Sequence, residues 1–275
     1  MHTVVDDLGA EVRVPERPQR LVSLVPNLSE TLWWWHLADR VVGVTDHCVA
    51  PPRAFDHARR VRGTKNPDVA AIIDLAPDLV VANEEENREL DVRRLREAGL
   101  AVYVTRVRTV RDAAEALGRL GAAVGVPGAG MGLRHALLRA LDQRRPPART
   151  VSTACPIWRD GDRRGADETW WLVGGDTFAG DLLDRCGFRP ALPEIADGRY
   201  PRLRLGALAD ADPDAVLLPD EPYAFAARDA EVFAGWRARV RYLDGTALTW
   251  WGPRTPHALG DLSRSARQLA RPPRT

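Results

Sequence analysis

The sequence contains very little lysine, cysteine and methionine, and it has no long apolar run. Lys65 is the only lysine among 39 lysine and arginine residues, a bias that high-GC codon usage explains, and the formal net charge is +1. Without a basic run or a strong positive charge, the chain lacks the electrostatic signature of a nucleic-acid-binding protein. No apolar stretch approaches the roughly 20 residues of a membrane-spanning helix, so we expect no membrane span.

The three cysteines, Cys48, Cys155 and Cys186, lie far apart and form no CxxC pair. Structural zinc held by cysteines is therefore not expected, and the spacing gives a disulfide no support. Residues 1–7 show neither the basic start nor the apolar segment of a secretory or lipoprotein leader. We expect the chain as written to stay in the cytoplasm, and to be extracytoplasmic only if a leader was removed or omitted.

Two similar stretches organise what is present. The Pro-Asp pair 77–78 precedes the apolar run 79–82, and the Pro-Asp pair 213–214 precedes the apolar run 215–218. An unbroken apolar run suits a strand buried on both faces of a parallel sheet. Polar residues follow both runs, at the edge where open α/β sheets bind ligands. With 275 residues to divide, the repeat predicts two similar α/β lobes.

Apolar periodicity and turn residues predict a hairpin, strands and helices along the whole chain. We expect the hairpin at 3–15, strands at 21–25, 40–44, 79–82, 101–104, 150–154, 170–173, 215–218 and 240–243, and helices at 30–37, 109–125, 127–145, 179–186, 205–209 and from 255 onward. Three local expectations accompany these elements. Ser29 should cap the helix that begins at Glu30, and residues 84–86, all glutamate, should open another helix. Of the tryptophans 33–35, two should be core and one surface.

The helix at 127–145 has no further strand of the first lobe after it. We therefore predict that it bridges the two lobes and ends at the prolines 146–147. The predicted organisation is an N-terminal α/β lobe at 1–126, a bridging helix at 127–147 and a C-terminal α/β lobe at 148–275.

A series of short motifs, in one order, resembles a known family. The motifs are 20–27 with Glu30, 40–46, 51–52, 77–81, 176–181, 199–201 and 251–254. They resemble the substrate-binding proteins of ABC importers for cobalamin and ferric siderophores, the helical-backbone metal receptor superfamily, over residues 3 to 270. The chain looks closest to a less characterised, leaderless subgroup. It departs from cobalamin binders at Asn83 and His47, where they tend to carry aromatic residues.

The resemblance implies a fold and a function. The fold is α/β, with two Rossmann-like lobes of parallel sheets and flanking helices, a single long bridging α-helix and a ligand cleft between the lobes. The function is non-catalytic binding of a corrinoid such as cobalamin, or of a ferric siderophore, with no intrinsic cofactor. The expected partners are that small molecule and, if the protein is exported, an ABC importer permease. We expect a monomer.

Candidate ligand-binding residues follow predicted strand ends in both lobes. The first lobe offers polar side chains, Asn27, His47, Lys65, Asn83 and Glu85, and the second offers Trp158, Tyr200, Tyr223, Phe225, Trp251 and Arg254. Aromatic rings stack on a flat chelate, and arginine pairs with a carboxylate, phosphate or amide. For each ring, the alternative is ordinary packing in the core. For Arg254, the alternative is that the side chain caps a helix or faces solvent.

Two other functions remain open from the residues alone. Direct metal-ion binding needs converging ligands, for which His47, Cys48 and Glu221 are the available trio. A chelatase-like enzyme acting on a tetrapyrrole would use a histidine and a glutamate to remove protons. No GxSxG, P-loop or HExxH motif is present, and we assign no catalytic residue and no metal ligand.

Overall fold

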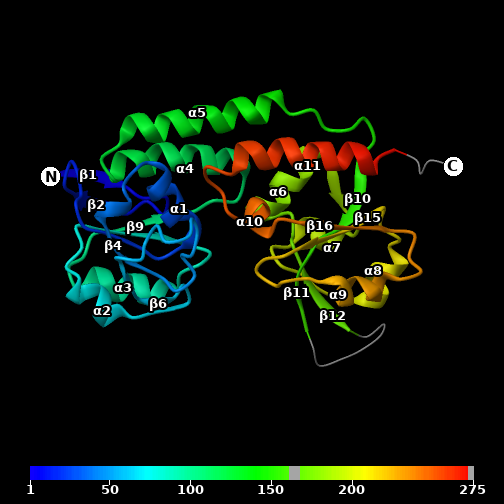
Figure 1. Cartoon of the computed structure of the whole chain (residues 1–275), viewed down its shortest axis with the longest axis horizontal. Coiled ribbons are helices and arrows are strands. Elements are labelled where there is room, and N and C mark those ends of the chain that lie inside the picture. Colours follow the sequence, from blue (N-terminus) through cyan, green and yellow to red (C-terminus); the bar gives the residue numbers. More distant parts are fainter. Residues whose placement is uncertain (161–167, 272–275) are drawn as a thin grey trace. The chain divides into compact units, whose positions relative to one another are not determined.

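The computed structural model describes residues 1–160 and 168–271, and its fold is α/β, as predicted (Figure 1). The chain divides into two compact units, Met1–Val107 with Arg111–Leu137, and Arg108–Val110 with Leu138–Thr275. Helix α5, Pro127–Gln143, contributes residues to both units. The predicted lobe boundaries, the bridging role of this helix and the cleft stay predictions. No helix of the described residues is long and apolar enough to cross a membrane.

The first unit is built on a five-stranded parallel sheet of order β5-β4-β3-β8-β9. Its strands are β3 Leu21–Ser23, β4 Val41–Val44, β5 Arg59–Arg60, β8 Leu79–Asn83 and β9 Val102–Thr105. The hairpin β1 His2–Val5 and β2 Glu11–Val14 and the short pair β6 Arg62–Gly63 and β7 Asn66–Pro67 complete the strands. The helices are α1 Pro26–Trp34, η1 Ala38–Arg40, α2 Val69–Asp74, α3 Glu89–Glu97 and α4 Val110–Ala123.

Helices α4 and α5 run side by side in Figure 1, and glycines set their closest approach. A Cβ on Gly121 would lie 2.6 Å from the Gly130 Cα, so neither position has room for a side chain. Along the same pair of helices, the Arg134 guanidinium donates to both Glu115 carboxylate oxygens at 2.8 Å. Such a bidentate pair fixes the relative position of the two helices within this unit.

The second unit combines a parallel and an antiparallel sheet. The parallel sheet has the order β13-β10-β15-β16, with β10 Val151–Ala154, β13 Phe188–Pro190, β15 Ala215–Pro219 and β16 Arg239–Leu243. The antiparallel sheet has the order β11-β12-β14, with β11 Pro156–Arg159, β12 Thr169–Leu172 and β14 Arg202–Arg204. The helices are α6 Phe178–Cys186, α7 Pro193–Asp197, α8 Leu205–Asp210, α9 Ala227–Ala230, η3 Glu231–Phe233, α10 Gly245–Thr249 and α11 Thr255–Leu269.

The repeated Pro-Asp pair has the same role in both units. Asp78, just before β8, accepts hydrogen bonds from the backbone N–H groups of Gln19 and Arg20 at 2.7 and 2.9 Å, ahead of the neighbouring strand β3. Asp214, just before β15, accepts one from the backbone N–H of Ser152 in the neighbouring strand β10 at 3.1 Å. Each aspartate therefore fixes the start of its strand against the strand beside it.

The expected cap at Ser29 is wrong, because α1 begins one turn earlier. Pro26 occupies the first turn of the helix, where its missing N–H costs nothing. Ser29 is buried inside the helix, and its hydroxyl donates to the Ser23 hydroxyl at 2.8 Å and to the Val25 carbonyl at 3.1 Å. The hydroxyl therefore joins α1 to β3 instead of capping the helix.

The tryptophans of α1 also differ from expectation. Trp33 and Trp34 are exposed to 40% and 52%, and only Trp35 is buried. One ring of the three is core and two are surface, the reverse of the predicted distribution. The helix ends at Trp34, so helical periodicity does not extend over all three rings.

The strand predicted at 170–173 is present as β12 but belongs to the antiparallel sheet. It pairs with β11 and β14 and with no strand of the parallel sheet. Trp170 and Leu172 are buried while Trp171 is exposed. This alternation is typical of an antiparallel sheet with one solvated face.

Candidate functional site

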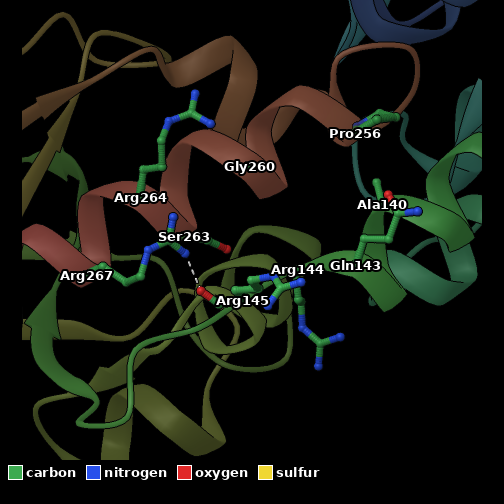
Figure 2. Close-up of a pocket in the computed structure, with 9 residues that line it drawn as sticks. All are labelled: Ala140, Gln143, Arg144, Arg145, Pro256, Gly260, Ser263, Arg264 and Arg267. Atoms are coloured by element: carbon green, nitrogen blue, oxygen red, sulfur yellow. Dashed lines mark hydrogen bonds between the residues drawn. The ribbon is translucent and has the colours of Figure 1, made fainter.

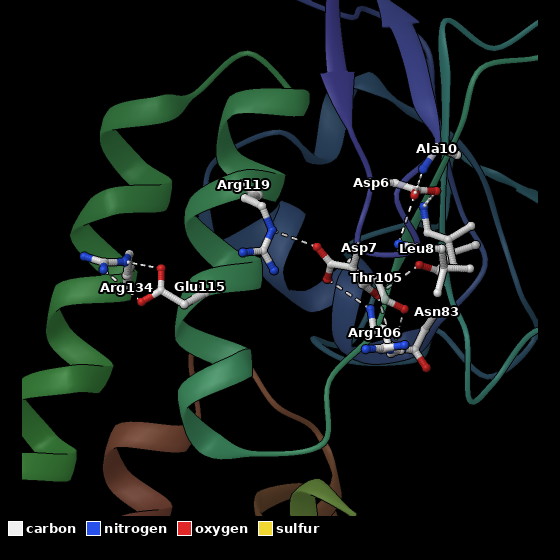
Figure 3. Close-up of polar contacts among 12 residues, drawn as sticks. Asp6, Asp7, Leu8, Ala10, Asn83, Thr105, Arg106, Glu115, Arg119 and Arg134 are labelled. Carbon is white, nitrogen blue, oxygen red and sulfur yellow. Dashed lines mark hydrogen bonds and ion pairs between the residues drawn. The ribbon is translucent and has the colours of Figure 1, made fainter.

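The first unit carries a polar group that we call the strand-end cluster: Thr64, Lys65, Asn83, Glu86 and Asn87. Asn83 is the last residue of β8 and is buried. Its side-chain oxygen accepts from the backbone N–H groups of Glu85 and Glu86, at 2.9 and 3.2 Å. Its amide donates to the Thr105 hydroxyl at the end of β9, at 3.1 Å (Figure 3). Asn83 therefore links two strand ends to the following turn.

Asn87 completes this turn and joins it to a second loop. Its side-chain oxygen accepts from the Asn83 backbone N–H at 2.9 Å, and its amide donates to the Thr64 carbonyl at 2.9 Å. Lys65 donates from Nζ to the Glu85 carbonyl. These bonds explain why the prediction that residues 84–86 open a helix is wrong. The two asparagine side chains take the backbone groups of the turn, and α3 begins only at Glu89.

Glu86 is the electrostatically perturbed member of the strand-end cluster. Burial raises the pKa of its carboxyl above the ordinary value; the nearby Lys65 ammonium opposes that shift, and the Glu85 carboxylate adds to it. The Thr64 hydroxyl donates to Glu86 Oε2 at 3.4 Å. A carboxyl with a raised pKa accepts or donates a hydrogen bond according to pH, so Glu86 can serve either kind of polar group on a ligand.

Asn27 and His47 occupy two further strand ends of the first unit. Asn27 lies in the first turn of α1 after β3 and is buried. His47 follows β4 and is exposed, with its Nε2 against Gly63, where a Cβ would lie 3.6 Å away. Its neighbour Cys48 is buried and lies 3.0 Å from the Ser29 hydroxyl, which donates to the sulfur. Burial raises the pKa of this thiol, so Cys48 is a poor metal ligand at neutral pH.

The turn of the hairpin β1–β2 contacts the end of β9 and helix α4. Asp7 accepts from the Arg119 guanidinium of α4 at 2.8 Å and from the Arg106 backbone N–H at 3.0 Å, just after β9 (Figure 3). Asp6 accepts from the backbone N–H groups of Leu8 and Ala10, at 3.0 and 2.8 Å. The hairpin turn, the end of β9 and α4 are thus held as one rigid support.

The second unit carries an aromatic cluster made of Trp158, Trp170, Tyr223, Phe225 and Phe233. The ring centroids of Trp158 and Tyr223 are 5.5 Å apart in an edge-on arrangement, and those of Tyr223 and Phe225 are 4.6 Å apart. Phe225 stacks on Trp170 at 5.5 Å, and Phe233 meets Trp170 edge-on at 5.3 Å. Trp158 is 49% exposed while Phe225 is 5% exposed. The cluster therefore runs from an exposed ring into the core.

A buried charge network lies beneath these rings. The Arg159 guanidinium pairs with Asp229 at 2.7 Å and with Glu168, and it lies 5.3 Å from the centre of the Trp170 ring. Both carboxylate side chains are at most 1% exposed. The Tyr223 hydroxyl donates to Asp229 at 3.5 Å. Arg159 thus compensates two buried charges and fixes the residues that support Trp158.

The remaining predicted residues of the second unit are less accessible. Tyr200 is half-buried in the loop before β14, and Trp251 is 5% exposed. Arg254 lies 5.5 Å from the centre of the Trp250 ring and donates to the Thr246 hydroxyl at 3.0 Å. Phe225 and Trp251 are packed in the core as the structure stands, so their direct contact with a ligand stays a prediction. Among the predicted rings, Trp158 is exposed and Tyr200 and Tyr223 are half-buried, so these three present accessible surface.

Some residues in or beside these clusters are not among the predicted site residues. Thr64 and Asn87 flank residues that were singled out, and only the hydrogen bonds show their roles. Trp171 stands opposite Trp158 in the register of β11 and β12, so the two exposed rings share one face of the sheet. The Arg202 guanidinium lies 5.9 Å from the centre of the Trp171 ring. The alternation of buried and exposed positions along strand 169–172 is the sequence pattern that could have predicted an exposed Trp171.

The part of the chain that the structure describes contains no group of three or more histidine, cysteine, aspartate or glutamate residues arranged to hold a metal ion. All three cysteines are buried and free, so no disulfide joins them. The accessible features are instead the aromatic surface of Trp158, the side chains of His47 and Lys65, and the half-buried Glu86 carboxyl with its raised pKa. These groups recognise an organic molecule with polar edges better than a bare ion, which needs several charged donors together.

Comparison with known proteins gives a consistent picture. The family model described as periplasmic binding protein matches residues 21–234. An uncharacterized ABC transporter substrate-binding lipoprotein of Bacillus subtilis, YvrC, is 26% identical over 96% of this chain and 84% of its own length. A cobalamin-binding protein of Halobacterium salinarum is 26% identical over 78% of this chain, and the match spans only 58% of that relative.

A solved structure shares the fold. The vitamin B12 binding protein BtuF of Vibrio cholerae superimposes with a TM-score of 0.75 over 93% of this chain and 99% of that protein, at 18% identity.

Proposed function

Because the chain belongs to the periplasmic binding protein family, we propose that it is a non-catalytic binding protein for a metal chelate, with a corrinoid as the first candidate. Trp158 carries this proposal: a half-exposed ring, backed by Tyr223, on a network that fixes its position. Such a platform suits a flat ligand that buries much apolar area. We take a corrinoid as the first candidate ligand because one relative, from Halobacterium salinarum, is named a cobalamin-binding protein.

The strand-end cluster supports the same proposal from the first unit. Asn83, Asn87 and Thr64 use most of their hydrogen bonds to hold two loops. That leaves Glu86, Lys65 and His47 as candidate contacts to the amide or carboxylate groups at the edge of a chelate. Pre-organised polar groups of this kind give orientation and specificity.

The partner and location follow from the family and remain part of the proposal. Since the Bacillus subtilis relative is named an ABC transporter substrate-binding lipoprotein, we propose an importer permease as the partner and an extracytoplasmic site of action. The expectation of a cytoplasmic protein stays a prediction. Fractionation of the native host, with detection of the full-length polypeptide and any lipid attached to it, distinguishes the two locations.

A spectroscopic panel tests the ligand class. The intact chain is mixed separately with cyanocobalamin, with a ferric hydroxamate siderophore, with haemin, with Fe²⁺ alone and with protoporphyrin together with Fe²⁺, and absorbance is followed before and after gel filtration. We expect one intact chelate to co-elute at a ratio near one per chain with its spectrum stable in time. Metal insertion into protoporphyrin would favour the chelatase alternative, and retention of Fe²⁺ alone would favour direct ion binding; either result contradicts the proposal.

A further inference from the structure

A groove in the second unit shares no lining residue with the aromatic cluster of that unit. The chain just after α5 and one face of helix α11 line this groove of about 270 Å³ (Figure 2). Arg144 and Arg145 directly follow α5, and Arg264 and Arg267 come from α11. Gln143 adds an amide, and Gly260 leaves the α11 side of the groove without a side chain. Within the described residues, no acidic side chain lines the groove.

Two of the four guanidinium groups are held by backbone carbonyls. Arg144 donates from Nε to the Arg185 carbonyl at 3.1 Å, and Arg267 donates to the Arg145 carbonyl, the bond drawn dashed in Figure 2. Carbonyl groups orient these side chains but carry no full charge to neutralise them. Both guanidinium groups are therefore positioned while their charge stays available.

The charge balance of the groove is strongly positive. Arg264 pairs with Asp261, whose side chain is 66% exposed. For Arg144, Arg145 and Arg267, the described part of the chain places no carboxylate within ion-pair distance. Cationic side chains at a helix C-terminus are favoured by the helix dipole. Arg144 and Arg267 lie near helix C-termini and bond to carbonyl groups, so a structural role explains their positions. No hydrogen bond to a carbonyl explains the position of the Arg145 side chain among the described residues.

We propose that this arginine groove binds a phosphate-bearing group, either a free phosphate compound or the headgroup of an anionic lipid. Guanidinium groups present paired N–H donors that match phosphate oxygens, which makes arginine the preferred residue for such ligands. The volume of about 270 Å³ fits a diphosphate or a headgroup and is below the range of larger ligand pockets, about 300–1,000 Å³. This site is separate from the chelate-binding function and does not depend on it.

Calorimetry and vesicle sedimentation test the proposal with the full chain at low ionic strength. One arm titrates pyrophosphate, and the other compares phosphatidylglycerol vesicles with phosphatidylcholine vesicles. Binding of pyrophosphate indicates a free phosphate ligand, and binding of phosphatidylglycerol vesicles alone indicates a lipid headgroup. Absence of binding in both arms overturns the proposal. Binding should weaken at high salt because exposed charges are screened.

Two variants and a control locate the binding. The double change Arg145→Gln and Arg264→Gln removes two guanidinium groups that hold no backbone carbonyl, and it should weaken binding about tenfold or more. Gly260→Glu should do the same, since its Cβ would lie at an ordinary 3.5 Å from Arg264 Nη1 and its carboxylate would neutralise the groove.

Arg241→Gln is the matched control, because Arg241 is exposed on β16 of the same unit outside the groove. Thermal unfolding without ligand verifies that all variants fold. If Arg241→Gln weakens binding as much as the groove variants do, the attraction is general charge and the groove is not a site.

Discussion

The strand-end cluster and the aromatic cluster arise from the same framework but differ in chemistry. Asn83 ends β8, and Tyr223 and Phe225 follow β15. A preceding aspartate fixes each of these strands to its neighbour, Asp78 in the first unit and Asp214 in the second. Trp158 and Trp170 lie on β11 and β12 of the antiparallel sheet. After the strand, the first unit places amides and hydroxyls that bond to backbone groups. The second unit places rings over a buried arginine. The two units thus share the aspartate that fixes a strand to its neighbour and differ in the side chains around the strand end, polar in the first unit and aromatic in the second.

Removal of a single interaction should destabilise the two clusters to different extents. The strand-end cluster is held by many neutral hydrogen bonds, each of modest net value. The aromatic cluster depends on a single buried cation, Arg159, between two carboxylates. Loss of one partner from a buried charge network costs far more than loss of one neutral bond. The four predictions below test this contrast, from the largest expected effect to the smallest.

Replacement of Arg159 should have the largest effect. Arg159→Met leaves Glu168 without the Arg159 ion pair and leaves Asp229 with the exposed Arg228, whose Nε is 3.9 Å from the carboxylate. We expect a loss of about 3–5 kcal/mol in the free energy of unfolding. Denaturant titration measures it. Arg237→Met is the control, because its pair with Asp212 is 71% and 55% exposed and should contribute less than about 1 kcal/mol. Equal losses in the two variants would show that the network under the rings is not stabilising.

Replacement of Asn87 should have an intermediate effect. Asn87→Ala leaves the buried Asn83 N–H and the Thr64 carbonyl without their partners, at a cost of about 1–3 kcal/mol. Hydrogen exchange should show faster exchange at residues 83–87 in particular. Asn66→Ala, at an exposed position on β7, is the control. A variant as stable as the wild type would mean that the asparagine pair does not hold the turn.

Replacement of Trp158 should affect ligand affinity and leave the fold intact. Since the ring is 49% exposed, Trp158→Ala removes little core packing. Loss of a ring stacked on a chelate should weaken binding about 5- to 150-fold, or roughly 1–3 kcal/mol. Trp34→Ala, at a ring 52% exposed on α1, is the matched control. Normal affinity of the Trp158 variant would place the ligand elsewhere.

Replacement of Glu86 should give the smallest effect, with a characteristic pH dependence. The pKa of the folded Glu86 carboxyl is raised. Between the ordinary glutamate pKa and this raised pKa, the folded protein retains a proton that the unfolded chain has lost. Stability therefore falls as pH rises from the ordinary glutamate pKa to the raised one. Glu86→Gln removes this loss, so the variant should melt about 1–3 °C higher than the wild type at pH 8.

The same Glu86 variant should show no such gain at a pH well below the ordinary glutamate pKa, where the carboxyl is protonated in both states. Glu97→Gln, at a side chain 67% exposed in its pair with Arg93, is the control and should show no comparable change with pH. A constant difference between Glu86→Gln and the wild type at both pH values would contradict the assigned cause.

The sequence predicts those parts of the fold that depend on local pattern. The apolar runs 79–82 and 215–218 are buried strands, and the Pro-Asp repeat marks equivalent positions in two units. Expectations fail where a side chain bonds across the fold. Ser29 looks like a cap but bonds to β3, and the turn at 84–86 is set by Asn83 and Asn87 rather than by helix propensity.

The candidate site is only partly predictable for the same reason. Residue type and position after a predicted strand select Asn83, Trp158 and Tyr223 as candidates, and their contact with a ligand stays a prediction. Exposure decides which rings are accessible to a ligand, and the sequence does not show it. Arg159 and Asp229 are 70 residues apart in sequence, and no local pattern joins them. Burial raises the pKa of Glu86, and the Thr64 hydroxyl that donates to its carboxylate lies 22 residues earlier in the sequence. Such long-range contacts appear only in the folded chain.

The central claim is that the protein binds an intact metal chelate and does not transform it. The most direct measurement is calorimetric titration of the full chain with cyanocobalamin, with Co²⁺ alone as the competing probe. The account predicts one site per chain, a Kd below about 1 μM, equivalent to more than about 8.2 kcal/mol, and no heat from Co²⁺. Saturable binding of Co²⁺ without binding of the corrinoid would contradict it.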